Sequence, residues 1–308
     1  MAPAFSVLLA ALLAATAPAV APPVATSAPP APQLAITIDD IPAHGPLPPG
    51  VDRRAVVDAI VAALRAHAVP AQGFYNRGFG IDDPQSPAVV AAWRSAGFPL
   101  GNHGYSHLDL DTAGPTAFIA DAVRNEAPLA AAMPGADWHW FRYPFLHEGA
   151  TVAARVAVRS ALRQRGYRIA AVTMSFGDYA WNAPYARCAA RNDRGAVAQL
   201  EDSYLTAARA EVQRERRMSA QLYGRDIPYV LLLHLGAFDA HMLPRLLDMY
   251  ETLGFRFVPL SVAEQDRFYA SAIDLSGSGP SPTLDGASRA RGLAVPDATP
   301  QPDAASCS

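Results

Sequence analysis

Apolar segments that end in acids or histidines are the feature that most constrains the fold of this chain. Residues 34–38 are mostly apolar and lead directly into Asp39 and Asp40, while the leucines at 231–233 lead into His234. Amphipathic segments of helical spacing separate such runs. Strands that alternate with helices predict an α/β fold around a parallel sheet. Because ligands of α/β folds bind at the carboxyl ends of the strands, we expect these polar residues to converge on one site.

The spacing of apolar side chains also predicts where the elements lie. Helices are expected at residues 52–67, 89–96, 115–132, 151–165, 195–222 and 241–253. Strands are expected at 34–38, at a segment reaching Phe74 and Tyr75, at 168–173, within 229–235 and at 255–259. This alternation does not distinguish a closed barrel from an open sheet.

Two histidines four residues apart, His103 and His107, form a candidate metal site with Asp40. Such a histidine pair often occurs by chance, but two imidazoles that share one face, as positions i and i+4 do on a helical turn, can bind one ion. Asp40 would supply an oxygen ligand and Asp39 would stay free as a base. The ligand types suit Zn²⁺ best, with Co, Ni and Mn as alternatives.

Three more motifs follow in a definite order. They are Arg142-Tyr143-Pro144-Phe145, Asp178-Tyr179-Ala180-Trp181 and Leu232-Leu233-His234. Together with Thr37-Ile38-Asp39-Asp40 and the pair His103 and His107, the ordered set resembles the polysaccharide deacetylases, the NodB-homology carbohydrate esterases. The resemblance spans roughly residues 34–262, with Gly104 where that family prefers Ser or Thr, and Phe145 in place of a Tyr.

This resemblance implies a single α/β domain folded as a distorted (β/α) barrel of the NodB type. It also implies a hydrolase that removes N-acetyl groups from an N-acetylated glycan, either peptidoglycan or a chitin-like oligosaccharide. Asp40, His103 and His107 would hold the divalent metal. Asp39 would act as the general base and His234 as the general acid. The backbone N–H at Phe145 would help to stabilise the oxyanion.

The same resemblance implies supporting roles for four further residues. Arg142 would hold Asp39 by paired hydrogen bonds and keep it ionised. Asp178 would pair with Arg142 or orient His234, and the residues alone leave both options open. Trp181 and Leu232 would form an apolar pocket for the acetyl methyl group, although plain core positions are an equal alternative for both.

Two other functions remain open at this stage. An amidohydrolase of the same fold could act on a small non-sugar amide. A non-catalytic carbohydrate-binding protein could have kept the fold, but a pure binder has no need for an acid and a base beside a metal. The predicted export of the chain favours the glycan, because cell-wall polymers lie outside the cell.

The N-terminal residues predict export to the periplasm or the extracellular space. Residues 5–15 are an apolar run of signal-peptide length followed by small residues, although no Lys or Arg precedes them. We expect a signal peptide over residues 1–25 and a Pro/Ala linker over 26–33, a disordered Ala/Pro tail being the alternative. The run is too short to cross a bilayer comfortably, so no stable membrane insertion is expected after its removal.

Composition also indicates where the domains end and which partners to expect. We expect the catalytic domain at residues 34–268 and a disordered tail at 269–308, which is rich in Ser, Gly, Pro, Ala and Asp. The formal net charge is −3 and no long basic run occurs, so nucleic acid is not an expected partner. Cys188 and Cys307 are the two cysteines and could bridge in an oxidising compartment. The oligomeric state is left open.

Overall fold

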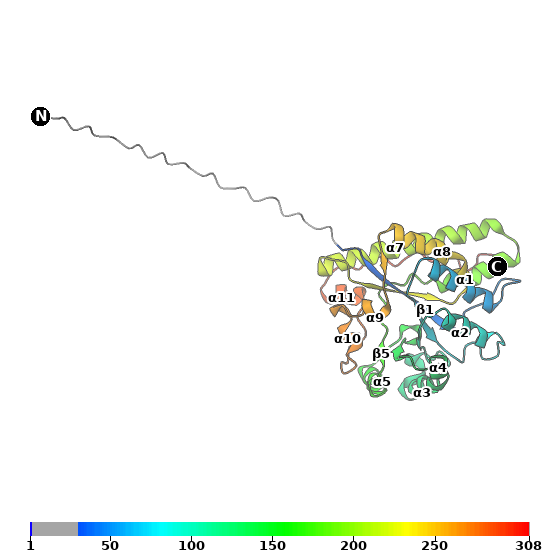
Figure 1. The fold of residues 1–308 in the computed structure, drawn as a ribbon, viewed down its shortest axis with the longest axis horizontal. Helices are drawn as coiled ribbons and strands as arrows, with labels where there is room; N and C mark the ends of the chain where they lie inside the picture. Colours follow the sequence, from blue (N-terminus) through cyan, green and yellow to red (C-terminus); the bar gives the residue numbers. More distant parts are fainter. Residues whose placement is uncertain (2–29, 308) are drawn as a thin grey trace. The chain divides into compact units, whose positions relative to one another are not determined.

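The computed structural model describes Met1 and residues 30–307 (Figure 1). The predicted signal peptide, apart from Met1, and residues 26–29 of the predicted linker therefore lie outside the described residues. From Ala31 onward the chain forms one unit built around a single parallel sheet, in agreement with the predicted single α/β domain.

Seven strands form this sheet. They are β1 (Gln33–Ile41), β2 (Gln72–Tyr75), β3 (Leu100–Asn102), β4 (Trp140–Phe141), β5 (Arg168–Ile169), β6 (Tyr229–His234) and β7 (Arg256–Phe257). Their order is β5-β4-β3-β2-β1-β6, with β7 paired to the start of β1, and every pair is parallel. Parallel sheets are covered on both faces, which explains why eight of the nine residues of β1 are buried.

The sheet curls until its two edges meet. Beyond β5, an isolated parallel bridge joins Met174 to Leu231 of β6. The backbone N–H of Thr173 donates to the carbonyl of Val230 over 3.0 Å, and that of Leu232 donates to Met174 over 3.1 Å. This contact decides between the open and closed sheets that the sequence pattern left open, and the predicted distorted (β/α) barrel of the NodB type is confirmed.

The helices lie outside the sheet, with α7 and α8 on one side in Figure 1 and α3, α4 and α5 on the opposite side. The helices before β6 are α1 (Arg53–Ala66), α2 (Ser86–Ser95), α3 (Leu110–Arg124), α4 (Glu126–Ala132), α5 (Val152–Gln164), α6 (Tyr179–Ala190) and α7 (Arg194–Tyr223). Those after it are α8 (Ala237–Thr252), α9 (Leu260–Ala263), α10 (Ala270–Ile273) and α11 (Leu284–Ala290), and two 3₁₀ helices span Pro144–Leu146 and Arg267–Tyr269.

Local sequence explains how these helices begin and end. The side chain of Asp52 caps α1 by accepting the N–H of Ala55, and the apolar stripe of α1 packs into the core. The single helix expected at 115–132 is two helices that meet at Asn125, whose side chain donates to the carbonyl of Tyr75 and accepts the N–H of Arg77. The sequence pattern did not predict α6.

The prediction of a disordered tail at 269–308 is wrong for the part of it that the structure describes. Residues 270–273 and 284–290 are short helices, and Leu284 is only 1% exposed. A disulfide joins Cys188 of α6 to Cys307, and Arg214 of α7 pairs with Asp285 of α11. A few separate contacts hold this segment, and no continuous apolar helix face does so. Its sequence therefore shows no apolar periodicity.

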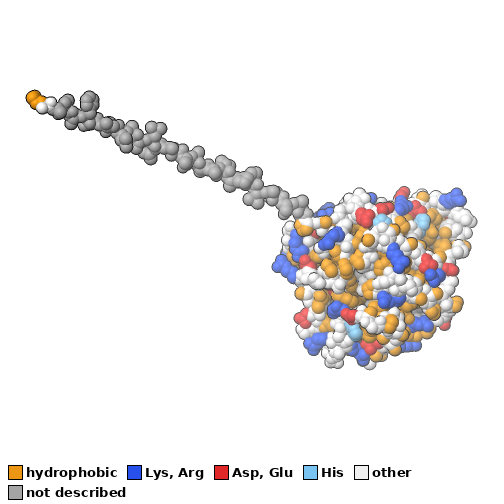
Figure 2. Space-filling view, in the orientation of Figure 1, with side chains coloured by type: hydrophobic (Ala, Val, Ile, Leu, Met, Phe, Trp, Pro, Cys, Tyr) orange, Lys and Arg blue, Asp and Glu red, His pale blue; other side chains and the backbone are white. Residues whose placement is uncertain are grey.

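The surface in Figure 2 mixes charged, polar and apolar side chains, with acids and arginines interspersed on the face shown. Among the described residues, no helix combines the length and the apolar character needed to cross a membrane. The register of the sheet places polar residues of neighbouring strands side by side, because Asp39 of β1 pairs with His234 of β6. The polar residues that follow the strands therefore meet at the carboxyl end of the sheet.

Candidate active site

A cavity of about 830 Å³ opens at the carboxyl end of the sheet. Its titratable lining includes Asp39, Asp40, His44, His103, His107 and His234. Its apolar and aromatic lining includes Phe79, Tyr143, Phe145, Leu146, Tyr179 and Leu232. The structure therefore brings most of the predicted site residues into one cavity, whose lining combines titratable and apolar side chains.

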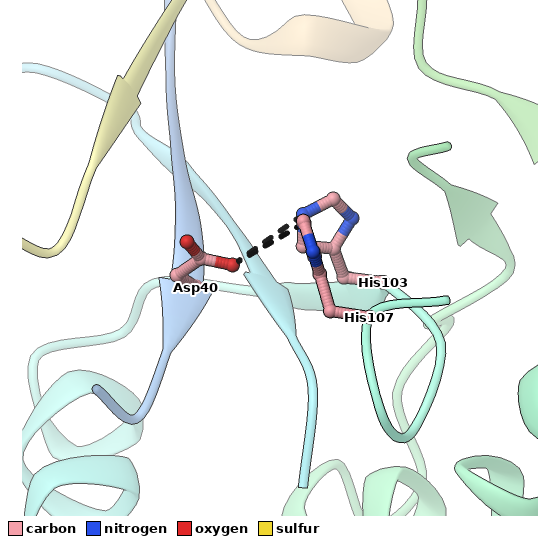
Figure 3. Close-up of side chains that lie close together, drawn as sticks. All are labelled: Asp40, His103 and His107. Atoms are coloured by element: carbon pink, nitrogen blue, oxygen red, sulfur yellow. Dashed lines mark ion pairs between the residues drawn. The ribbon is translucent and has the colours of Figure 1, made fainter. Parts of the chain in front are cut away.

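The three predicted metal ligands face one another (Figure 3). Oδ1 of Asp40 lies 3.6 Å from Nε2 of His103 and 3.7 Å from Nε2 of His107. Donors around a tetrahedral ion with bonds of about 2.1 Å stand about 3.4 Å apart, so this spacing fits a bound divalent cation. Nδ1 of His103 is 2.9 Å from the carbonyl of Arg142, which fixes the ring with Nε2 turned toward Asp40.

The two histidines reach this position from a loop, so the helical turn suggested by their spacing is not present. The loop follows β3, and left-handed backbone at Gly104 (φ +70°) and His107 (φ +54°) folds it back on itself. The carboxylate of Asp121 on α3 holds it by accepting the N–H groups of Tyr105 and Ser106 over 2.8 and 3.0 Å. A Cβ at position 104 would lie 2.9 Å from that carboxylate, which explains the glycine.

The charges of these groups suit cation binding. Burial by itself would raise the pKa of Asp40, but the hydrogen bond from His44 and the nearby charges of His234 and His103 hold it well below its usual range. Burial, together with the charge of His103, lowers the pKa of His107 to about 4. At neutral pH the site therefore presents an ionised carboxylate and a neutral His107 imidazole, the forms that bind metal.

Asp39 stands beside the ligands with one oxygen free. Its Oδ2 lies 3.7 Å from Nε2 of His103 and 3.6 Å from Nη1 of Arg142. Its Oδ1 is buried and has no hydrogen-bond partner among the described residues. Asp39 lines the cavity, so its carboxylate is placed to accept a proton from water at this end of it.

Arg142 is fully buried and does not line the cavity. The predicted pair of hydrogen bonds to Asp39 is not present, because the closest approach is a 3.6 Å ion pair and Nη2 instead donates to Thr37 over 3.1 Å. The guanidinium also lies over the ring of Phe74, 4.7 Å from its centroid. Arg142 is therefore placed beside Asp39 as a buried positive charge and does not reach the cavity.

Asp178 orients His234, which settles the choice that the sequence left open. The carboxylate of Asp178 lies 3.0 Å from Nδ1 of His234 and accepts the backbone N–H of the same residue over 2.7 Å. Burial opposes a charged imidazole, but the negative charge of Asp178 outweighs it and raises the pKa of His234 to about 10. His234 is therefore protonated at neutral pH, as a general acid must be.

The predicted substrate-contacting residues divide into two groups. Leu232 lines the cavity, and Phe145 does so with a side chain that is 58% exposed. No hydrogen bond from the backbone N–H of Phe145 is found among the described residues, so this donor is available to an oxyanion. Trp181 does not line the cavity.

Trp181 is instead part of the core, which corrects its predicted role. It is fully buried, it packs edge-on against Phe176 and Tyr204, and its Nε1 donates to Ser203 over 2.8 Å. The motif enters α6, so residues two apart point in different directions. Tyr179, 54% exposed, is the aromatic residue of this motif that faces the cavity, and its ring centroid lies 5.5 Å from that of His234.

Sequence reasoning missed three residues that the structure places at the site. Nδ2 of Asn76 donates to Oδ1 of Asp40 over 2.8 Å, and the ring of Phe79 stacks on His107. His44 lies in the Pro-rich segment after β1, with Nδ1 2.8 Å from Oδ2 of Asp40. Its position four residues after an Asp ligand was a usable signal, whereas Asn76 and Phe79 carried none.

Comparison with known protein families agrees with this geometry. The sequence model of the family described as polysaccharide deacetylase matches residues 26–170. The predicted resemblance to the polysaccharide deacetylases is confirmed. The matched segment contains both aspartates of β1, both loop histidines and the Arg142 motif, while Asp178 and His234 lie beyond it and join the site through the fold.

Solved structures of this family share the fold. BA3943 from Bacillus anthracis, described as a CE4 family pseudoenzyme, is 14% identical with a TM-score of 0.52, and the match covers 74% of this chain and 64% of that one. The chitin deacetylase from the fungal pathogen Colletotrichum lindemuthianum is 20% identical with a TM-score of 0.51, covering 78% and 92%. The chain thus spans slightly less than two thirds of BA3943. The comparison with curated proteins finds no match.

A third solved structure with this fold comes from a larger enzyme. The Xyl-CE4 domain of a multidomain xylanase from the hindgut metagenome of Trinervitermes trinervoides is 14% identical with a TM-score of 0.50. The match covers 77% of this chain and 92% of that domain. At these identities the likeness concerns the fold, and the chemistry has to be argued from the site.

Proposed function

We propose that this protein is a metal-dependent hydrolase that removes N-acetyl groups from an N-acetylated glycan, peptidoglycan or a chitin-like oligosaccharide. The observation that carries the proposal is the placement of Asp39 and His234 on paired positions of β1 and β6, flanking the donors of Asp40, His103 and His107. A base, an acid and a cation site in one cavity are the parts that amide hydrolysis requires.

The residues of the chain divide the chemistry as follows. Asp40, His103 and His107 would hold the divalent ion, which supplies polarisation of the acetyl carbonyl and acidification of water. Asp39, which lines the cavity, takes the proton of the attacking water. His234 donates a proton to the departing amine, and the free N–H of Phe145 donates to the oxyanion, a contribution of about 3–4 kcal/mol.

The types of donor atom also indicate which metal to expect. Two imidazole nitrogens and one carboxylate oxygen suit zinc best, with cobalt, nickel and manganese as alternatives. Asp40 also accepts hydrogen bonds from Asn76 and His44, which hold its carboxylate in place as the outer partners of metal ligands do. Nδ1 of His103 is fixed in the same way by a backbone carbonyl.

A non-catalytic binding protein is the second candidate, and the likeness to BA3943, described as a pseudoenzyme, is the observation that favours it. The acid and base of this chain argue against it. A binder has no use for a raised pKa at His234 or for a buried, unpaired carboxylate oxygen at Asp39. An amidohydrolase acting on a small non-sugar amide is the third possibility, and substrate panels separate it from the first.

We also propose that the protein is exported to the periplasm or beyond. The apolar run at residues 5–15 supports this. The disulfide between Cys188 and Cys307 supports it as well, because such bonds persist in oxidising compartments. Cell-wall polymers lie in that compartment, which is consistent with a glycan substrate.

The deciding experiment measures acetate release by the purified protein. The panel contains N-acetylglucosamine oligomers, peptidoglycan fragments and small N-acetyl amides, each with and without a chelator. We expect release from the sugars, loss of release with chelator and recovery with added zinc. Release from the small amides alone would favour the amidohydrolase. Sugar binding without release, in metal-loaded protein, would favour the non-catalytic alternative.

A further inference from the structure

His44 lines the cavity, but it is neither the proposed general acid nor the proposed general base. Its side chain is 17% exposed, and its Nδ1 lies 2.8 Å from Oδ2 of Asp40. Its ring centroid is 4.7 Å from that of His234. Nε2 of His44 has no hydrogen-bond partner among the described residues, and the residue lines the cavity.

The loop that carries His44 is held rigidly. Arg53 donates to the carbonyls of His44 and Gly45, both over 2.7 Å. Asn182 on α6 donates to the carbonyl of Pro46 over 2.8 Å. Gly45 has φ +54°, and a Cβ there would come within 2.5 Å of the Asn182 side chain. Side chains from α1 and α6 thus fix the backbone around His44, which places the imidazole at one position in the cavity.

Two aspartate–histidine pairs therefore face the same space. In one, Asp178 holds Nδ1 of His234, and in the other, Asp40 holds Nδ1 of His44. In both pairs Nδ1 is the nitrogen that the carboxylate engages, so the remaining polar atom of the ring is Nε2. For His44 this atom has no partner in the part of the chain that the structure describes. A hydroxyl can both donate and accept, so it can bind Nε2 whichever tautomer or charge the ring carries.

We propose that His44 is a substrate-contacting residue whose Nε2 hydrogen-bonds a hydroxyl of the sugar next to the scissile N-acetyl group, while its Nδ1 positions Asp40. The inference rests on the proposed glycan deacetylase function and deepens it, because it makes a hydroxyl-bearing ring part of what the site recognises. It predicts that N-acetyl compounds without hydroxyls bind less well. A site built to pair a hydroxyl rejects analogues that lack it, because its own polar group then stays unpaired.

The test uses substitutions that separate the two nitrogens of His44. In His44→Asn the amide group can replace the contact of Nδ1 with Asp40 but does not reach the position of Nε2, whereas His44→Ala removes both. His139→Asn is the matched control, because Nδ1 of His139 also contacts an aspartate, Asp137, over 3.0 Å, outside the cavity. Each substitution is placed in an Asp39→Asn background, so that binding is measured without turnover.

Calorimetric titration of the metal-loaded proteins with N-acetylglucosamine trimer gives the first result. We expect the dissociation constant to rise at least tenfold with His44→Asn and to stay unchanged with His139→Asn. N-acetylcyclohexylamine, which has the ring but no hydroxyls, should show no such difference between Asn and His at position 44. An equal trimer affinity with and without His44 would overturn the proposal, and so would a complete lack of trimer binding.

Zinc titration of the metal-free proteins against a competing chelator gives the second result. We expect His44→Asn to keep zinc affinity within about threefold, and His44→Ala to weaken it by about 10–100-fold, the usual effect of removing the outer partner of a ligand. Unchanged affinity in His44→Ala would overturn the role of Nδ1. Acetate release by the wild type is scored separately, so a failure of the deacetylase proposal is distinguishable from a failure at His44.

Discussion

The carboxylate of Asp178 holds His234 at two points, the side-chain Nδ1 at 3.0 Å and the backbone N–H at 2.7 Å. Asp178 is fully buried at the start of α6, whereas His234 ends β6, 56 residues later in the chain. The contact fixes the imidazole relative to the sheet and stabilises its charged form, so it decides over which pH range His234 can donate a proton.

Asp178→Asn should lower the alkaline limit of activity. The negative charge of Asp178 favours the imidazolium, so its removal lowers the pKa of His234 from about 10 toward the ordinary value near 6.5. Less of the acid form is then present above pH 7, and kcat at pH 8 should fall at least tenfold while kcat at pH 6 falls less. Rate–pH profiles of both proteins measure this, and an unshifted alkaline limb would contradict it.

Asp39→Asn should stop turnover and leave the metal in place. Asp39 is outside the three donors of the cation site, and its carboxylate is the group proposed to accept the proton of water. Loss of a general base lowers kcat by about 10²–10⁴-fold. Elemental analysis and acetate release are measured on the same preparation. Activity near the wild-type level would reject Asp39 as the base.

His103→Ala should lose metal and activity together. Its Nε2 is one of the three donors, and its Nδ1 is already committed to the carbonyl of Arg142. His139→Ala, an exposed histidine outside the cavity, is the control and should keep both. Metal content is measured after dialysis against zinc. A full equivalent of zinc in His103→Ala would show that the ligand set is wrong.

Glu211→Gln/Glu215→Gln should stabilise the folded protein at alkaline pH. Burial raises the pKa of Glu211 to about 7 and that of Glu215 to about 9, while unfolded glutamates titrate near 4.3. Between about pH 5 and pH 9 the folded chain therefore binds more protons than the unfolded chain, so stability falls as pH rises.

The double variant removes both groups, so its unfolding free energy should exceed that of the wild type at pH 8 and approach it at pH 5. Denaturant titrations at the two pH values measure this. Asp202→Asn is the control, because Asp202 is on the same helix with a side chain that is 84% exposed. An equal difference in unfolding free energy between the variant and the wild type at both pH values would show that these carboxyls do not govern the dependence.

Cys307→Ser should destabilise the protein without touching the cavity. The disulfide to Cys188 joins residues 119 apart in sequence and restricts the unfolded chain accordingly. We expect a loss of about 2–4 kcal/mol in unfolding free energy. Ser306→Ala, on the same segment, is the control. Reduction of the wild type should reproduce the loss, and equal stability of the oxidised wild type and Cys307→Ser would refute it.

The order of the motifs was enough to predict the resemblance to the polysaccharide deacetylases, the barrel, and the convergence of Asp39, Asp40, His103, His107 and His234 on one cavity. Each of these depends on residues at the ends of apolar strands, and strand ends of a parallel sheet meet at one edge whatever the loops do. Thus Asp39 and His234 could be expected at one site from the apolar runs that precede them, and the register of β1 with β6 places them next to each other.

The sequence could not predict the features that depend on contacts outside the regular helices and strands. Trp181 and Tyr179 are two residues apart at the start of α6, yet Trp181 lies in the core and Tyr179 lines the cavity. Contacts between residues far apart in sequence also decide three other features. They are the pairing of Asp178 with His234, the C-terminal segment joined by the disulfide, and the position of the loop that carries His44. Such contacts follow from packing in three dimensions, for which local spacing carries no signal.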